Sequence, residues 1–416
     1  MRAHAEHIPV VTALGILAPI GDNTASFWQA LLNGQSGIAP VRSFDTSAFA
    51  THIGCEIHSA AIDALAVQYP HIGRAALLAY YAGQQALADL NAEQRHHTSL
   101  CIGTTMGEAC WLEAWDAEAV RAGPQAVPAA ELLRSGPDQI GLDCMQLLGL
   151  NGSLQVLAAA CAAGNYAIAR AADLIRLGRA ERVLAGGTDA FSRVAYTGFA
   201  RLGALAHEAC RPFSADRDGI VIAEGAAMLL IESLASAQQR GAPILAHVLG
   251  SGLSCDAHHI VSPHPEGAGA LRAMQAALKN AQLAPTDLDW ICAHGTGTRA
   301  NDRAEVLAAR ALCHDHVVPM SSLKAITGHA LGAASAIEAV GCVLALIHQT
   351  IPPTWNHRAY DVDCDWDLVA NAPRTADLQV VLNNAYAFGG NNASLLFGRG
   401  GSKHGPAGDP TDHMHA

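Results

Sequence analysis

The sequence predicts an α/β fold, and three observations support this prediction. Half of the 416 residues are hydrophobic but only 5% are aromatic, which indicates an aliphatic, alanine-rich core of buried strands under closely packed helices. Short β-branched or alanine-rich segments alternate with helical patterns along the chain. The length suggests about two or three core-forming units, and both halves of the chain repeat this rhythm around a junction near residues 235–245, which predicts a pseudo-duplicated architecture.

The first expected elements are a buried strand over residues 10–14 and a helix over 23–32. The apolar run 8–20 after Arg2 is similar to the central region of a signal peptide, but no small-residue cleavage site follows it, so we assign it to the strand. Further strands are expected over 99–103, 154–160, 182–186, 228–232, 244–249, 290–294 and 381–384.

Residues 401–416 are rich in Gly, His, Pro and Asp, and we expect them to be a disordered tail. No uninterrupted apolar stretch, even around 340–347, is expected to approach the ~18 residues of a membrane span. We therefore expect a soluble, cytoplasmic protein with no membrane partner.

Charge and cysteine content exclude several functions. Lys and Arg number 25 against 37 Asp and Glu, a net charge of −12, and no basic run could neutralise a row of phosphates, so nucleic acid is not an expected partner. Eleven cysteines, an odd number without a C-x-x-C pair, indicate thiols in a reducing compartment. No metal-ligand spacing occurs, and no Walker or Rossmann glycine pattern opens a helix, so neither a metal nor a bound nucleotide is expected.

Cys161 stands where the strand 154–160 runs into a helix that carries Ile168, Ala172 and Ile175 at helical spacing and ends at Gly178. A thiol at a helix N-terminus lies at the positive end of the helix dipole, which predicts a lowered pKa and a nucleophilic thiolate. A structural buried cysteine is the alternative, which the ten other cysteines share.

His294 begins the segment His-Gly-Thr-Gly-Thr, and His329 lies in a second glycine-flanked loop. Histidines can donate a hydrogen bond to a thioester carbonyl or move a proton near neutral pH, so with a thiolate they favour acyl transfer, although any one of the 21 histidines taken alone could be incidental. Lys324 is one of only three lysines and stands in an uncharged stretch, where a buried ammonium would act on the histidines; an exposed lysine is the alternative. Asp302 and Glu305 could orient the Lys324 side chain.

Five motifs, in matching order and spacing, resemble those of the β-ketoacyl-acyl-carrier-protein synthases, and most closely the elongating type II enzymes of bacterial fatty-acid synthesis. They are residues 159–164 (AACAAG), 211–219 (RPFSADRDG), 294–298 (HGTGT), 322–329 (SLKAITGH) and 384–390 (NAYAFGG).

The resemblance extends from about residue 10 to 398 and implies a thiolase-like fold. Two βαβαβαββ halves would stack as a five-layered α-β-α-β-α sandwich. Residues 1–240 would contain the nucleophile and residues 241–400 both histidines.

The resemblance also implies a decarboxylative Claisen condensation. Cys161 would take the acyl group from a carrier-protein thioester, with the backbone N–H groups of Cys161 and Phe388 as the oxyanion hole. His294 and His329 would bind the malonyl thioester and promote loss of carbon dioxide. Lys324 would tune the two histidines.

Asp302 and Glu305 would brace that lysine, and Thr296 and Thr298 would support the same loop. Phe388 would also gate the acyl tunnel, with Gly389 and Gly390 giving its loop freedom. Met106 aligns with a position that limits acyl-chain length.

This chain departs from the family pattern at several positions. Asn391 replaces a threonine and Ala387 a glycine in the gating loop, and Asn165 and Tyr166 are bulkier than expected at the dimer seam. These departures bear on acyl preference and on the partner.

The implied partners are an acyl carrier protein and a second ketosynthase-like chain, in a homodimer or a heterodimer. The carrier would supply the phosphopantetheine arm, so no resident cofactor is expected. Carrier proteins are acidic and dock on basic residues near the entrance, yet residues 69–84 offer only Arg74.

Three other functions are considered. One is a ketosynthase subunit of a type II polyketide or polyene pathway, paired with a chain-length-factor-like chain. Another is a non-catalytic structural subunit. The third, a degradative thiolase that uses coenzyme A, typically has a second catalytic cysteine in Gly-x-Cys-x-Gly, where this chain has Phe-Gly-Gly-Asn at 388–391.

Overall fold

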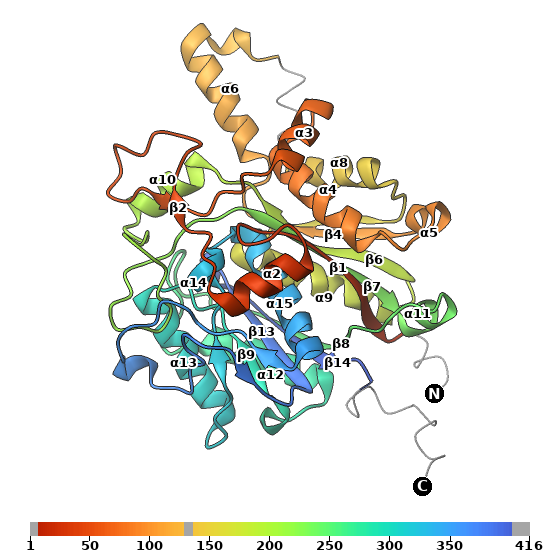
Figure 1. Ribbon diagram of the computed structural model, residues 1–416, viewed down its shortest axis with the longest axis vertical. Coiled ribbons are helices and arrows are strands. Elements are labelled where there is room, and N and C mark those ends of the chain that lie inside the picture. Colours follow the sequence, from red (N-terminus) through yellow and green to blue (C-terminus); the bar gives the residue numbers. More distant parts are fainter. Residues whose placement is uncertain (1–6, 129–135, 402–416) are drawn as a thin grey trace.

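The computed structural model describes residues 7–128 and 136–401 (Figure 1). The predicted tail lies outside the described residues from position 402 onward. In the described part of the chain, ten strands form one hydrogen-bonded sheet that consists of two five-stranded halves. The first half has the order β5 (Leu154–Leu157), β4 (Ser99–Gly103), β6 (Arg182–Asp189), β7 (Gly225–Ser233) and β1 (Pro9–Leu17).

The second half repeats this topology strand for strand. Its order is β10 (Met320–Ser321), β9 (Trp290–Cys292), β13 (Val380–Tyr386), β14 (Asn391–Arg399) and β8 (Ala246–Cys255). In each half the first three strands in this order pair in parallel, and the last three pair antiparallel. The halves are joined where β1 pairs with β8 at two positions. The predicted duplication is therefore present in the strand order and in the pairing directions.

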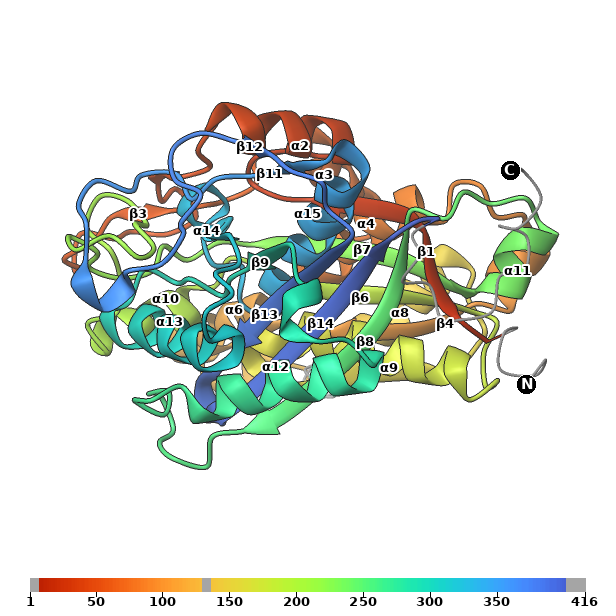
Figure 2. The same cartoon turned by 90° about the horizontal axis from the view of Figure 1, so that it is seen from below.

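Helices separate and cover the two half-sheets in five layers, as the resemblance implies (Figure 1). The outer face of the first half is covered by α4 (Arg74–Ala86) and α8 (Asp138–Leu148), and that of the second by α12 (Ala268–Ala281) and α13 (Arg299–Cys313). Between the half-sheets lie α9 (Ala163–Arg176) and α15 (Ala334–His348) (Figure 2). Because both faces of each half-sheet are covered, the central strands are almost entirely buried and consist mostly of apolar residues.

Strand β7 illustrates this double burial. All nine of its residues are buried. Ala226, Met228 and Leu230 pack toward α4, whereas Leu229 and Ile231 pack toward the central helices. The two faces follow from the alternation of side chains along a strand.

The remaining elements connect these layers or cover their edges. The helices are α2 (Thr24–Asn33), α3 (Ala60–Gln68), α5 (Ala92–His96), α6 (Ala109–Ala122), α10 (Arg193–Arg201), α11 (Leu234–Gln239) and α14 (Lys324–Thr327). The 3-10 turns are η1 (Pro124–Ala126), η3 (Ala160–Ala162), η4 (Pro285–Asp287), η5 (Leu331–Ala333), η6 (Val362–Cys364) and η7 (Phe388–Gly390). The short strand pairs are β2 (Ala39–Pro40) with β3 (Ile53–Gly54) and β11 (Thr350–Ile351) with β12 (Arg374–Thr375).

Most predicted strands are present, but two end earlier than expected. Strand β5 ends at Leu157, because the chain then turns through Ala160, which has a positive φ of 47°. Strand β9 ends at Cys292, before His294. After this strand, the loop that carries His294 leads into α13, which begins at Arg299.

One helical segment is as long and apolar as a membrane span, although Ser335 and Glu338 interrupt it. Leu331–His348, which comprises η5 and α15, is 18 residues long with a mean hydropathy of 1.8, long and apolar enough to cross a membrane. Of these residues, 89% are buried inside the protein, as expected for a core helix between two sheets.

The layered core generates a stability prediction. Leu229 is fully buried against the central helices, so Leu229→Ala removes apolar contacts and leaves a cavity. We expect it to lower the free energy of unfolding by about 2–5 kcal/mol, measured by urea denaturation. Leu177 is 61% exposed, and the matched Leu177→Ala variant should change stability by less than about 0.5 kcal/mol. Equal effects of the two variants would contradict the layer assignment.

Candidate active site

Cys161 lies on the turn between β5 and α9, at the point where the central layer meets the first half-sheet. Ala160 has a φ of 47°, an uncommon conformation for a residue with a side chain, and it turns the chain sharply before the cysteine. Gly164 allows a close approach on the other side, because a Cβ there would lie 2.7 Å from the backbone nitrogen of Ala336. The N-termini of α9 and α15 therefore meet beside the sulfur.

The state of the Cys161 thiol differs from the sequence prediction. The side chain is buried, and burial raises the pKa of the thiol to about 12, although Lys324 acts in the opposite direction. The backbone N–H groups of Cys161 and Phe388 are directed at the sulfur and also lower this pKa. Desolvation thus outweighs the helix dipole, and the resting residue is a thiol rather than the predicted thiolate.

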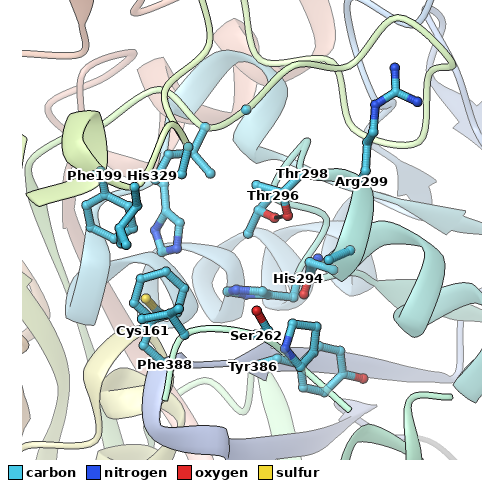
Figure 3. A pocket seen from close by; sticks show the side chains of 18 of the residues that line it. Cys161, Phe199, Ser262, His294, Thr296, Thr298, Arg299, His329, Tyr386 and Phe388 are labelled. Atoms are coloured by element: carbon cyan, nitrogen blue, oxygen red, sulfur yellow. Dashed lines mark hydrogen bonds between the residues drawn. The ribbon is translucent and has the colours of Figure 1, made fainter. Parts of the chain in front are cut away.

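A cavity of about 420 Å³ opens from Cys161 toward the surface (Figure 3). In Figure 3 the rings of His294 and His329 point into the same space as the sulfur, with Thr296 and Thr298 further out. The lining residues are Cys161, Phe199, Leu202, Gly203, Ala204, Arg217, Asp218, Gly219, Ile220, Asp256, Val261, Ser262, Pro263, His294, Thr296, Thr298, Arg299, Ala300, Asn301, His329, Tyr386, Ala387, Phe388 and Asn392.

The two histidines are held in the same tautomer by different donors. The Lys324 ammonium lies 3.3 Å from Nδ1 of His294, and the Leu331 N–H donates to Nδ1 of His329 at 3.2 Å. Because both donors require an acceptor at Nδ1, each ring carries its proton on Nε2. The ring centroids are 5.4 Å apart with an interplanar angle of 84°. Burial and the nearby Lys324 hold the pKa of both imidazoles well below the usual value, so both are neutral.

Lys324 is a buried cation, 1% exposed, and its partners explain its place in the site. Its ammonium donates to the carbonyl oxygen of His294 at 2.8 Å and forms an ion pair with Glu338 of α15. Burial raises the pKa of Glu338 to about 7, while Lys324 lowers it. Glu338 is not among the residues predicted from the sequence, although a lone acidic residue in the apolar segment 331–348 is a recognisable signal.

Asp302 and Glu305 have a different role from the one expected. Glu305 accepts the N–H groups of His294 and Gly295 at 2.9 and 2.8 Å, and Asp302 accepts those of Phe213 and Gly297 at 2.8 and 3.2 Å. These carboxylates hold the backbone of the loop that carries His294, whereas Glu338 is the carboxylate that pairs with Lys324.

The hydroxyl groups of Thr296 and Thr298 lie 2.9 Å apart on the wall of the cavity. Both threonines belong to the loop that Glu305 and Asp302 hold by its N–H groups. The predicted supporting residues are therefore grouped in one loop beside His294.

Phe388 lines the cavity beside Cys161. Its ring stacks on Phe199 of α10, with centroids 5.3 Å apart and an interplanar angle of 29°. Gly389 and Gly390 have φ angles of 81° and 78°, which favour glycine. The Gly389 N–H donates to the Ile260 carbonyl at 2.8 Å, so a second loop anchors this turn.

Two other predicted positions lie apart from the cavity. Met106 is not among the lining residues and packs in a neighbouring apolar cluster with Phe199, so its role in chain length stays a prediction. Asn165 is fully buried between α9, β13 and α15: it exchanges hydrogen bonds with Asn383, and its backbone N–H donates to the Ser335 hydroxyl. The expectation that its bulk lies at a dimer seam is therefore wrong.

Arg74 is also engaged inside the protein. Its guanidinium donates twice to Glu224, both at 2.7 Å, and once to the Ile57 carbonyl at 2.8 Å. The basic residue that the sequence offers for docking in 69–84 is thus occupied by an internal ion pair.

All eleven cysteines are unpaired. Among the residues that the structure describes, no group of three or more His, Cys, Asp or Glu side chains could hold a metal ion.

Comparisons with known proteins identify the family. The model of the β-ketoacyl synthase N-terminal domain matches residues 8–237, and that of the C-terminal domain matches residues 245–358. Nodulation protein E of Rhizobium meliloti (strain 1021) is 38% identical, with 93% of this chain and 98% of the relative covered. A 3-oxoacyl-[acyl-carrier-protein] synthase 2 from Synechocystis is 37% identical, with 93% and 97% covered.

Solved structures agree in fold. The ishigamide ketosynthase/chain length factor has a TM-score of 0.91 and 37% identity, with 95% of this chain and 100% of that chain covered. A β-ketoacyl synthase from Burkholderia phymatum STM815 has a TM-score of 0.88 and 30% identity, with 94% and 99% covered. The chain belongs to the β-ketoacyl synthase family and is an acyl-transferring condensing enzyme with a thiolase-like fold.

Proposed function

We propose that this enzyme catalyses the decarboxylative Claisen condensation of malonyl-acyl-carrier protein with an acyl chain bound to Cys161. The observation that carries the proposal is that His294 and His329 both present a neutral Nε2–H to the cavity that contains the Cys161 sulfur. A pair of N–H donors around one point suits a thioester carbonyl, on which negative charge develops when carbon dioxide leaves.

In the first half-reaction the Cys161 sulfur attacks the carbonyl of an acyl-carrier thioester. The N–H groups of Cys161 and Phe388 stabilise the oxyanion. The tetrahedral intermediate then expels the carrier sulfur, which takes the proton lost by the Cys161 thiol. The products are an acyl-cysteine and a free carrier thiol, so atoms and charge balance.

In the second half-reaction the malonyl thioester oxygen accepts hydrogen bonds from Nε2–H of His294 and His329. The bond to the carboxylate breaks, carbon dioxide leaves, and the electron pair forms the enolate. The enolate carbon attacks the acyl carbonyl, and the Cys161 sulfur leaves and takes up one proton. Since both Nδ1 atoms are occupied by donors, the rings act here as hydrogen-bond donors rather than as bases.

The family resemblance supports fatty-acid-type elongation, with the phosphopantetheine arm of an acyl carrier protein as the substrate carrier and no resident cofactor. A second candidate is a ketosynthase subunit of a type II polyketide or polyene pathway. It is favoured by the match to the ishigamide ketosynthase/chain length factor at a TM-score of 0.91. The intact set of Cys161, His294, His329 and Lys324 favours an active chain over a non-catalytic subunit.

We also propose that the chain works as a dimer, either with itself or with a chain-length-factor-like partner. Strand β5 supports this proposal, because it is the edge strand of the first half-sheet and its four residues are only partly buried. The eleven unpaired cysteines support a reducing, cytoplasmic location.

Two variants separate the half-reactions. Cys161→Ala should abolish acyl transfer, because the nucleophile is lost. His329→Ala should leave acylation of Cys161 within about threefold while lowering decarboxylative condensation at least about 100-fold, because one of the two donors to the enolate is lost. Mass spectrometry of the protein after incubation with a ladder of acyl carrier proteins measures the first step, and release of labelled carbon dioxide measures the second. Normal condensation by either variant would exclude the proposed function.

The raised pKa of Cys161 predicts a pH dependence of its reactivity. With the pKa at about 12, the thiolate fraction and the rate of alkylation by iodoacetamide should rise about tenfold per pH unit between pH 7 and 9. Alkylation followed by mass spectrometry of the Cys161 peptide gives this rate, and Cys255 is the exposed thiol for comparison. A plateau at or below pH 8 would show a pre-formed thiolate and contradict the structure.

A further inference from the structure

Asp189 is a buried carboxylate beside the site that the proposed chemistry does not use. It ends β6 and is fully buried. One carboxylate oxygen accepts from the Thr104 hydroxyl at 2.7 Å and the Met106 N–H at 2.9 Å. The other accepts from the Thr105 N–H at 2.9 Å and the Gly332 N–H at 2.6 Å. Four neutral donors thus converge on one carboxylate.

These donors come from two loops that are far apart in the sequence. Thr104, Thr105 and Met106 follow β4, and Gly332 lies in η5, just before α15. The loops touch through their backbones, because a Cβ on Gly332 would lie 2.7 Å from the Thr104 carbonyl carbon and 2.8 Å from an Asp189 oxygen. A shift of either loop therefore changes the position of the other.

The η5 turn determines the orientation of His329. Leu331 precedes Gly332, has a φ of 50°, and donates its N–H to Nδ1 of the His329 ring at 3.2 Å. A positive φ at a leucine is strained and persists only where neighbouring contacts enforce it. The bond from the adjacent Gly332 N–H to Asp189 is such a contact.

Glu305 is a second buried carboxylate that holds a histidine-bearing loop by its backbone N–H groups. It accepts the N–H groups of His294 and Gly295 in the loop after β9, the strand that corresponds to β4 in the duplicated fold. One buried carboxylate in each half thus holds a loop next to the cavity by its N–H groups.

We propose that Asp189 is a positioning residue for the decarboxylation step, which it supports by holding the η5 turn so that His329 keeps Nδ1 as an acceptor and presents Nε2–H to the substrate. This inference rests on the proposed function, because it assigns Asp189 an effect through His329. It concerns the turnover rate rather than substrate affinity, since Asp189 does not line the cavity.

The test is a double-mutant cycle between Asp189 and His329. Asp189→Asn keeps the size of the side chain but replaces one acceptor oxygen with a donor that faces two donors. We expect kcat for malonyl decarboxylation to fall at least about tenfold, with KM within about twofold, because ground-state binding is unchanged. In the His329→Ala background, Asp189→Asn should lower the remaining rate by less than about twofold, because the residue through which it acts is gone.

Asp289→Asn is the matched control. Asp289 accepts the N–H groups of Gln379 and Val380 at 2.7 and 2.8 Å, at the far end of β13 from Phe388, and it does not line the cavity. This variant should leave kcat and KM unchanged. Thr104→Val removes one of the four donors to Asp189 and replaces Asp189→Asn in the test if that variant does not fold. We expect it to lower kcat about threefold in the wild-type background and to have no effect in the His329→Ala background.

The outcomes separate this inference from the proposed function. Normal decarboxylation by His329→Ala would overturn the proposed function and the inference with it. Two results would overturn the inference alone, provided that His329→Ala is impaired. One is that Asp189→Asn and Thr104→Val retain full kcat. The other is that each of them lowers kcat by the same factor in the His329→Ala background as in the wild-type background.

Discussion

The buried ammonium of Lys324 is the interaction on which the rest of the site depends. A charge removed from water is tolerated only when partners compensate for its lost hydration, and here Glu338 and the His294 carbonyl do so. The lysine thereby connects α14, α15 and the loop after β9. Burial lowers the pKa of both imidazoles, and Lys324 lowers it further, so both rings are uncharged; Lys324 also gives His294 its tautomer. Removing the cation would change the protonation of the site as well as its packing.

The duplicated fold explains why such a site can form at the interface of two halves. Strands β4 and β5 in one half and β9 and β10 in the other are parallel neighbours, so their carboxyl ends lie at the same edge of each half-sheet. Loops at the carboxyl ends of parallel strands meet at one edge, where ligands bind in α/β proteins. The nucleophile follows β5, His294 follows β9, and His329 follows β10. Buried carboxylates then fix these loops by accepting their N–H groups.

The sequence is most informative where a pattern is local. The five buried residues of β4 are predicted to the residue, and the motif residues Cys161, His294 and His329 meet at one cavity. Contacts between distant segments are not visible in this way: the pairing of Lys324 with Glu338 depends on the packing of α14 against α15. The pKa of Cys161 is mispredicted because the helix position is local, whereas the desolvation that raises the pKa comes from the whole fold.

Neutron diffraction tests the central claim most directly, because it locates the protons on both rings. For crystals of the deuterium-exchanged protein near pH 7, we expect deuterium on Nε2 and none on Nδ1 of His294 and His329, with three deuterons on Nζ of Lys324. Deuterium on both nitrogens of either ring would show an imidazolium ion. That result would contradict an active site in which burial and the nearby Lys324 keep two neutral histidines as hydrogen-bond donors.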